Sequence, residues 1–190
     1  TTGINNTATG YESLYSNTTG NYNTAQGYNS LKANTTGADN TATGYYSLYS
    51  NTTGNYNTAQ GNYSLQANTT GIQNTSQGYS SLALNTTGAY NIAIGNSAAY
   101  SNTNGIRNVV IGVQAFYYNT SGDDTIAIGY RAGREDSGGS NNLASTDSVF
   151  LGMNTKPSQS GETNTIVIGD TAIGIGSNTV VLGNDSITTT

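Results

Sequence analysis

The chain has few of the side chains that usually carry catalysis. It contains no histidine and no cysteine, so the commonest general bases, nucleophiles and zinc ligands are missing from its sequence. Its 10 acidic residues are scattered, and the adjacent pair Asp123 and Asp124 lies in a turn-like stretch. We expect that pair to cap a turn instead of performing metal or acid–base chemistry. The sequence therefore predicts a protein that is not an enzyme and uses no cofactor or metal.

Tyrosine is the abundant side chain that could bind a ligand, with 15 copies in the chain. A tyrosine ring combines apolar area with a polar tip, which suits sugars and polymer surfaces. The alternative is that the rings stack on one another between repeats and shield the backbone. The candidate surface-binding tyrosines recur at two positions of a repeat: Tyr11, Tyr28 and Tyr45, and Tyr22, Tyr56 and Tyr90.

A second candidate surface lies in a polar, glycine-rich stretch over residues 133–146. This part of the chain gathers Arg131, Arg134, Glu135 and Asp136, although only 8% of all residues are charged. Such a stretch is either a solvated loop or a recognition loop, since binding residues concentrate on loops held by a rigid scaffold. Arg131 and Arg134 are accordingly candidate surface-binding residues.

The elements that must position these side chains come from a 17-residue repeat. The pattern T-T-G-x-x-N-T-A-x-G-x-x-S-L-x-x-N returns without interruption between Gly3 and Gly122. An unbroken period of this length is typical of stacked-repeat proteins, in which each unit packs only on its neighbours. Its structural columns include Gly10, Gly27, Gly44 and Gly61; Leu14, Leu31, Leu48 and Leu65; and Asn17, Asn34, Asn51 and Asn68.

Each unit reads as two short strands and two turns. In the first unit we expect strands over residues 6–10 and 13–16 and a turn over residues 17–20. Stacked copies of asparagine and threonine would form hydrogen-bonded ladders from one coil to the next. The predicted fold class is all-β, a parallel β-roll or β-solenoid with 17-residue coils that rise about 4.8 Å each.

The side-chain pattern of the first strand suggests which of its faces points inward. Residues i and i+2 of a strand share one face, and this pair changes along the chain from Thr7 and Thr9 to Ile92 and Ile94. Because isoleucine replaces threonine, we expect this face to point inward, which argues against an exposed threonine array of the kind that binds ice. The residue between them is small, so we expect both faces of the strand to be covered and several rolls to pack together.

The period changes after Gly129. The next strand-closing glycines are Gly152, Gly169 and Gly183, so the separations in sequence become 23, 17 and 14. We divide the chain into a regular repeat region over residues 1–129, a polar insertion loop over 130–147 and irregular coils over 148–190.

Composition narrows the partners that the chain could have. The net charge is −5 and there is no basic run, so binding to nucleic acid is not expected. No apolar run approaches the roughly 20 residues that a helix needs to span a bilayer, so membrane insertion is not expected either. Ile, Val, Leu and Phe make up roughly a sixth of the chain, less than in ordinary globular domains. We therefore expect partner copies, intertwined or side by side in a homotrimer, to supply the missing burial.

Two families resemble this sequence. One resemblance is to the head repeats of trimeric autotransporter adhesins, which are trimers of left-handed parallel β-rolls. It rests on the final 14-residue coil and on the strand motifs I-A-I-G, V-V-I-G, I-V-I-G and V-V-L-G. Residues 148–188 resemble the end of phage tail-fibre proteins, where the segment precedes an intramolecular chaperone domain that trimerises the fibre. The 17-residue units also resemble predicted tail-fibre-domain proteins of environmental bacteria. The dominant period departs from the adhesin pattern, being 17 instead of 14.

These resemblances imply a structural, host-surface-binding and non-catalytic segment of a trimeric tail fibre or fibrous adhesin. Its expected location is extracellular, on a virion tail fibre or a bacterial cell surface, and its expected partner is a cell-surface glycan or another host receptor. One alternative is a bacterial cell-surface filament or adhesin built by end-to-end stacking of subunits. Another is a single-chain solenoid that binds a small ligand.

Overall fold

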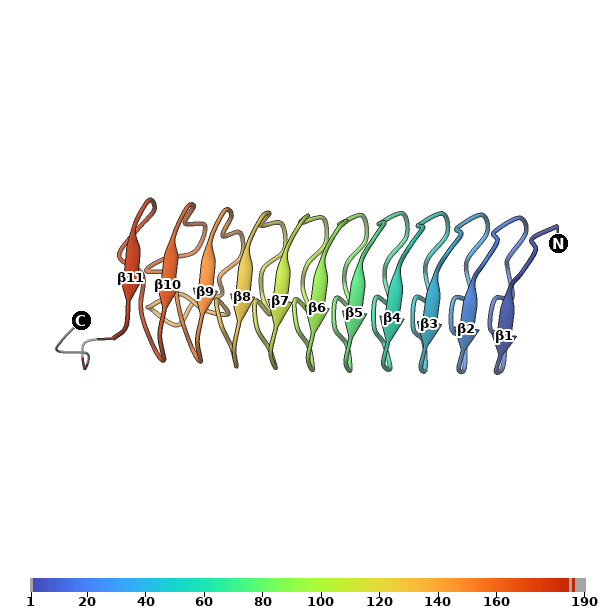
Figure 1. The fold of residues 1–190 in the computed structure, drawn as a ribbon, viewed down its shortest axis with the longest axis horizontal. Helices are drawn as coiled ribbons and strands as arrows, with labels where there is room; N and C mark the ends of the chain where they lie inside the picture. Colours follow the sequence, from blue (N-terminus) through green and yellow to red (C-terminus); the bar gives the residue numbers. More distant parts are fainter. Residues whose placement is uncertain (1, 185, 187–190) are drawn as a thin grey trace.

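The computed structural model describes residues 2–184 and 186, and they form a parallel β-solenoid. Eleven strands of three residues each lie side by side in one sheet, in sequence order, with β1 at one end of the rod and β11 at the other (Figure 1). The predicted all-β solenoid with 17-residue coils is confirmed. The strands are β1 (Thr7–Thr9), β2 (Thr24–Gln26), β3 (Thr41–Thr43), β4 (Thr58–Gln60), β5 (Thr75–Gln77), β6 (Ile92–Ile94), β7 (Val109–Ile111), β8 (Ile126–Ile128), β9 (Val149–Leu151), β10 (Ile166–Ile168) and β11 (Val180–Leu182).

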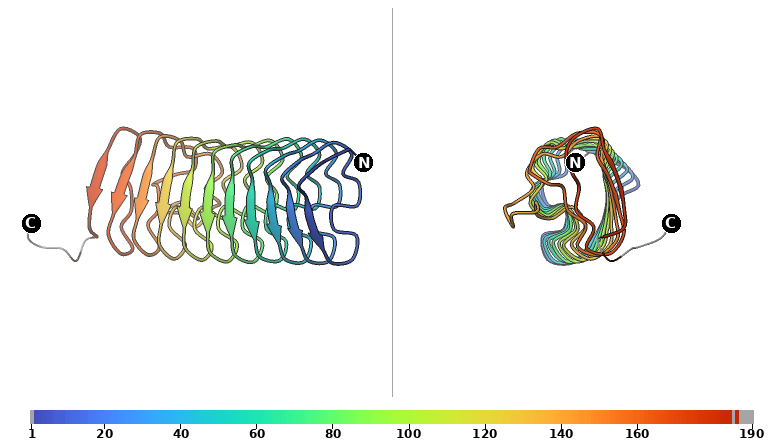
Figure 2. Two further views of the ribbon diagram at one scale, coloured as in Figure 1. Left: turned by 45° about the vertical axis from the view of Figure 1, so that its right-hand side comes forward. Right: turned by 90° about the vertical axis from the view of Figure 1, so that its left-hand side faces the viewer.

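The strand register follows the spacing of the repeat. Thr7 of β1 pairs with Thr24 of β2, and the same 17-residue offset holds up to β8. The offset in sequence becomes 23 from β8 to β9, then 17 to β10 and 14 to β11. The insertion therefore leaves the sheet intact, and its extra residues form a hairpin closed by an antiparallel bridge between Glu135 and Asn141. Viewed along the axis, the insertion projects on the side of the rod away from the strands (Figure 2).

The core is a narrow column of small and aliphatic side chains. The middle residue of each strand points inward, and from β2 to β10 it is fully buried. Opposite it lies the leucine column, in which Leu31, Leu48 and Leu65 are fully buried and Leu14 is nearly so. Phe116 continues this column and lies near Phe150 of β9, with ring centroids 6.4 Å apart. One chain thus closes a continuous core around its own axis.

The predicted second strand, over residues 13–16 and its copies, is wrong. Leu14 has a φ of 52° and Glu12 a φ of 51°, both in the left-handed region, and residues 11–16 form turns and no strand. It still bonds to the next coil, because Leu14 N donates to Ser30 O at 3.1 Å and Ser16 N donates to Lys32 O at 3.0 Å. A leucine in the left-handed region costs about 1–2 kcal/mol, which its burial in the core offsets.

The predicted asparagine ladder is present. Asn34 Nδ2 donates to Asn17 Oδ1 at 2.8 Å and to Gly37 O at 2.9 Å, and Asn51 and Asn68 repeat the pattern. A second buried ladder starts at Asn23 and runs parallel to the first. Amides of the first ladder bond to their own turn and to a neighbouring coil, whereas amides of the second ladder bond to the coils on both sides. Polar side chains thus stabilise the stack where a globular protein would use apolar ones.

Glycine is required where each strand closes. Gly44, like its counterparts Gly10, Gly27 and Gly61, has a φ near 130°, a region that L side chains rarely adopt. A Cβ on Gly44 would also lie 2.7 Å from the backbone carbon of Gly61 in the next coil. This column therefore admits no side chain.

The predicted orientation of the strand faces is wrong as well. The Thr7 and Thr9 face and its copies point outward, and the small middle residue points into the core. The interior is too narrow for two aliphatic rows because the leucine column already fills the opposite wall. We name the outward surface of the sheet the outer sheet face. It carries threonine and glutamine in β1–β5 and isoleucine, valine and leucine in β6–β11.

Candidate functional site

The first candidate surface is a row of tyrosines at the corner that follows each strand. Tyr28 stacks between Tyr11 and Tyr45, with ring centroids 5.1 and 5.3 Å apart and planes inclined by 13° in both pairs. Burial among the neighbouring rings raises the pKa of Tyr45. Tyr46 and Tyr63 extend the row through tilted and edge contacts. The rings cover one another's faces, as the stacking alternative predicted, so mainly edges and hydroxyls remain for a partner.

Tyr22, Tyr56 and Tyr90 lie at another corner, before the strand. All three side chains are exposed and all three residues have positive φ values of 56°, 59° and 61°. Asp39 and Gln73 occupy the coils between them, so successive rings are two coils, or about 9.6 Å, apart. They are separate exposed rings and form no stacked platform.

The third candidate surface is a cleft beside the insertion, and it contains both predicted arginines. The cleft has a volume of about 330 Å³ and is lined by Arg131, Arg134, Glu135, Asn154, Lys156, Thr171 and Ile173. Arg131 comes from the turn after β8, Asn154 from the turn after β9 and Thr171 from the turn after β10, so three successive coils form its floor. We call it the cationic cleft.

The two guanidinium groups of the cationic cleft meet at one neutral side chain. Arg131 Nε and Arg134 Nη1 donate to the same atom, Gln114 Oε1, at 3.3 and 3.1 Å. Arg134 Nη2 donates to Tyr118 OH at 3.2 Å. Each guanidinium also lies over an aromatic ring, at 4.9 Å from the centroid of Tyr130 for Arg131 and at 5.2 Å from that of Tyr118 for Arg134. These contacts hold both cations in fixed positions.

One carboxylate, that of Glu135, partly balances the positive charge of the cleft. Glu135 Oε1 lies 3.4 Å from Arg134 Nε and Glu135 Oε2 lies 3.9 Å from Lys156 Nζ. Arg134 Nε is buried and has no hydrogen-bond partner among the described residues, so its contact with Glu135 is poorly aligned. Arg134 and Lys156 thus share a single acidic partner through long contacts, and Arg131 forms no ion pair among the described residues.

The base of the insertion is rigidly tied to the core. Asn142 Nδ2 donates to Gly133 O at 2.9 Å, and Ser140 N donates to Asp136 Oδ1 at 2.8 Å. Gly133 has a φ of 61° and leaves no room for a side chain, because a Cβ there would lie 2.8 Å from the Phe150 ring. The cleft wall is therefore anchored against the Phe150 side chain.

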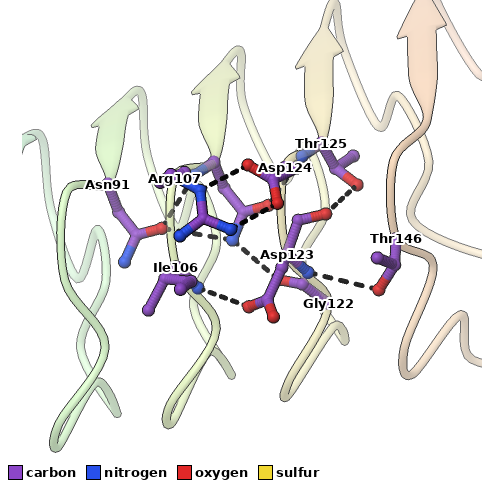
Figure 3. Close-up of polar contacts among 9 residues, drawn as sticks. Asn91, Ile106, Arg107, Gly122, Asp123, Asp124, Thr125 and Thr146 are labelled. Atoms are coloured by element: carbon purple, nitrogen blue, oxygen red, sulfur yellow. Dashed lines mark hydrogen bonds and ion pairs between the residues drawn. The ribbon is translucent and has the colours of Figure 1, made fainter.

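The remaining two cationic side chains, Lys32 and Arg107, form ion pairs outside the cationic cleft. Lys32 Nζ lies 2.5 Å from Glu12 Oε2. Arg107 forms a bidentate pair with Asp124, with Nε and Nη2 each 2.6 Å from a carboxylate oxygen (Figure 3). Its hydrogen bonds hold the pKa of the Asp124 carboxyl below its usual range.

The Asp123 and Asp124 side chains both bond to the preceding coil. Asp123 Oδ1 accepts a hydrogen bond from Ile106 N at 2.7 Å, as Figure 3 shows, and Asn55 does the same for Ala38 N in an earlier coil. Asp124 pairs with Arg107 at the neighbouring position of the turn. Both carboxylates thus serve the contact between successive coils. Over residues 2–184 and 186, no group of three or more acidic side chains is placed to hold a metal ion.

Sequence reasoning missed Lys156 and Asn154 as members of the cleft. The signal that could have found them is the 23-residue offset between β8 and β9, which carries Arg131 onto Asn154 and Gly133 onto Lys156. Lys156 also begins a bridge with Ile173 in the next coil. Applying the repeat spacing across the insertion would have predicted that these residues lie together.

Comparison of the chain with protein-family models, curated proteins and solved structures gives no match. The described part of the chain also has no helix whose length and hydrophobicity would allow it to cross a membrane.

Proposed function

We propose that this protein is a rigid, non-catalytic rod segment of a trimeric tail fibre or fibrous adhesin that binds a host surface. It would act outside the cell, on a virion tail fibre or a bacterial surface. The β-solenoid supports a structural role, since its continuous sheet and its ladders of buried asparagine keep all the coils in line. Binding surfaces on its corners and its insertion would then be presented at fixed spacing along the rod.

The observation that carries the proposal is the aliphatic half of the outer sheet face. From β6 to β11 every outward strand position holds isoleucine, valine or leucine, and none holds a charged residue. Ile92 is 40% exposed, and Leu182 of β11 is 62% exposed. We estimate the exposed aliphatic area at roughly 600 Å², at the upper end of the patches that monomeric proteins present to water.

A patch of this size approaches the roughly 800 Å² that each partner buries in a standard protein interface. The polar half of the same face, from β1 to β5, sets the direction of packing. Copies that run parallel and in register place aliphatic rows against aliphatic rows and threonine rows against threonine rows. Antiparallel copies would place threonine and glutamine against isoleucine. Parallel packing is the arrangement that a fibre with all copies pointing the same way requires.

We propose that the copies pack side by side and are not intertwined. Every strand from β1 to β10 pairs with the strand of the next coil in its own chain, so no strand edge along the rod is left for another chain to enter. The outer sheet face offers an apolar surface along which three copies can pack around a common axis.

The test is the solution mass of the protein, measured by light scattering. We expect three times the chain mass of 19.6 kDa, and we expect the variant carrying Ile111→Lys and Ile126→Lys to sediment as a single chain, because both side chains are exposed in the isolated rod. The matched control is Val113→Lys, an exposed aliphatic position outside the strands. A wild-type protein that remains a single chain at micromolar concentration would refute the proposal, and a mass of two chains would refute its threefold form.

A further inference from the structure

The cationic cleft holds an unbalanced charge in a chain that is otherwise acidic. Arg131, Arg134 and Lys156 line it together with one carboxylate, that of Glu135. The other two cations of the chain have their own acidic partners at 2.5 and 2.6 Å. The chain as a whole has a net charge of −5, yet this one site has a surplus of positive charge.

The two guanidinium groups are held together without an anion between them. Both donate to Gln114 Oε1, which is neutral, so two like charges lie within hydrogen-bond reach of one atom. The terminal nitrogens of Arg131 have no hydrogen-bond partner among the described residues, and the nearest acid to Lys156 is 3.9 Å away. Like charges held this close disfavour each other, and an anion placed in the cleft would relieve that repulsion.

We propose that the cationic cleft binds the carboxylate of an acidic sugar, such as a uronic acid residue of a surface polysaccharide. This inference deepens the proposed host-surface binding and rests on it. The planar fork of Arg131 matches a carboxylate bidentately, and the Lys156 ammonium supplies a second point charge.

The rest of the lining suits a sugar ring. The cleft volume of about 330 Å³ lies at the lower end of the range for ligand pockets, near the size of one or two sugar units. Asn154 lines the cleft, and its side-chain amide can donate to and accept from sugar hydroxyl groups. Ile173 is 46% exposed and offers an apolar surface to the ring carbons.

The position of the cleft keeps it accessible in a fibre. The insertion that forms its wall lies on the side of the rod away from the strands (Figure 2). Packing through the outer sheet face would leave that side open to solvent. Self-association and ligand binding can therefore be tested separately.

The experiment is calorimetric titration of the 190-residue protein with trigalacturonate, a short acidic saccharide, at about 0.15 M salt. The neutral maltotriose is the matched ligand. We expect binding of trigalacturonate, none of maltotriose, and a loss of at least about tenfold in affinity for Arg131→Gln and for Lys156→Gln. We expect Glu135→Gln to strengthen binding, because it removes the carboxylate that competes with the ligand.

The matched control is Arg107→Gln, which removes the same charge from a side chain that pairs with Asp124 and does not line the cleft. If Arg107→Gln weakens binding as much as Arg131→Gln, the attraction is diffuse and the proposal is overturned. It is also overturned if wild-type protein shows no binding of trigalacturonate up to on the order of 10 mM, or if inorganic phosphate binds more tightly. Circular dichroism and light scattering on each variant show whether fold and mass are retained. If the protein is a single chain that binds trigalacturonate, only the proposed trimer is refuted. If it is a trimer that does not bind trigalacturonate, only the proposed ligand of the cleft is refuted.

Discussion

Removing one rung of the second asparagine ladder tests whether buried polar side chains hold the coils together. Asn57 is fully buried, and its side chain takes part in four hydrogen bonds. Its Nδ2 donates to Asn40 Oδ1 at 3.2 Å and to Gly71 O at 2.9 Å, while its Oδ1 accepts from Asn74 N at 3.0 Å and from Asn74 Nδ2 at 3.1 Å. The variant Asn57→Ala deletes all four.

The expected cost follows from what each former partner retains. Gly71 O keeps its bond from Asn68 Nδ2, and Asn74 Nδ2 keeps its bond to Gly88 O. The Asn74 N–H has no other acceptor among the described residues, so it is left buried and unpaired at a cost of about 1–3 kcal/mol. With roughly 0.5–1.5 kcal/mol for each of the other three bonds, the free energy of unfolding should fall by about 2.5–7.5 kcal/mol.

Thermal unfolding followed by circular dichroism measures this loss. A domain of this size loses about 2–4 °C of Tm per kcal/mol, so we expect a fall of about 5–30 °C. Hydrogen exchange of the Asn74 amide should accelerate in the variant, because that N–H loses its acceptor. The matched control is Asn96→Ala, at an exposed asparagine, which should change Tm by less than about 2 °C. If Asn57→Ala behaves like this control, the ladder contributes no stability and the reasoning is wrong.

Three further predictions concern the core, the strand-closing glycines and one ion pair. Leu48→Ala should lower the free energy of unfolding by about 2–5 kcal/mol in urea titrations, because Leu48 is fully buried in the narrow core. Gly78→Ala should lower Tm sharply, since Gly78 has a φ of 134° and a Cβ there would lie 2.5 Å from a carbonyl oxygen of the next coil, whereas Gly138→Ala in the insertion should change Tm little. The Arg107 pair lowers the pKa of the Asp124 carboxyl, so its stabilisation is complete above about pH 4 and is lost as pH falls through the lowered pKa. In an NMR titration the Asp124 midpoint should rise when Arg107 is replaced by glutamine, and an unchanged midpoint would show that the pair does not form in solution.

The repeat period alone was enough to predict the stacking of the coils. Residues that recur once in every 17-residue unit can lie in register only if the coils are parallel, and the observed pairing of Thr7 with Thr24 follows directly. The strand-closing glycines and the Asn17 ladder were predicted for the same reason, since a position that recurs in every coil meets its own copies above and below.

The direction of the side chains was decided by the tertiary structure. A three-residue strand shows two faces, and its sequence does not state which one the coil encloses. Isoleucine at Ile92 suggested the interior, yet Ile92 is 40% exposed and the small Ala93 is the fully buried residue. The conformation of the leucine segment escaped prediction likewise, since left-handed Leu48 is favourable only once the core and the next coil hold it.

The cationic cleft combines both kinds of information. The charged residues of the insertion are visible in the sequence, and so are the changed coil lengths that bring Arg131, Asn154 and Thr171 to one corner. The shared contact of two arginines with Gln114 and the approach of Lys156 depend on how the hairpin folds back on the coil. By itself the sequence determined the parallel stack and its register, because these follow from the period. Only the tertiary structure decided which side chains face inward and which charges converge, because these depend on the space that the closed coil leaves.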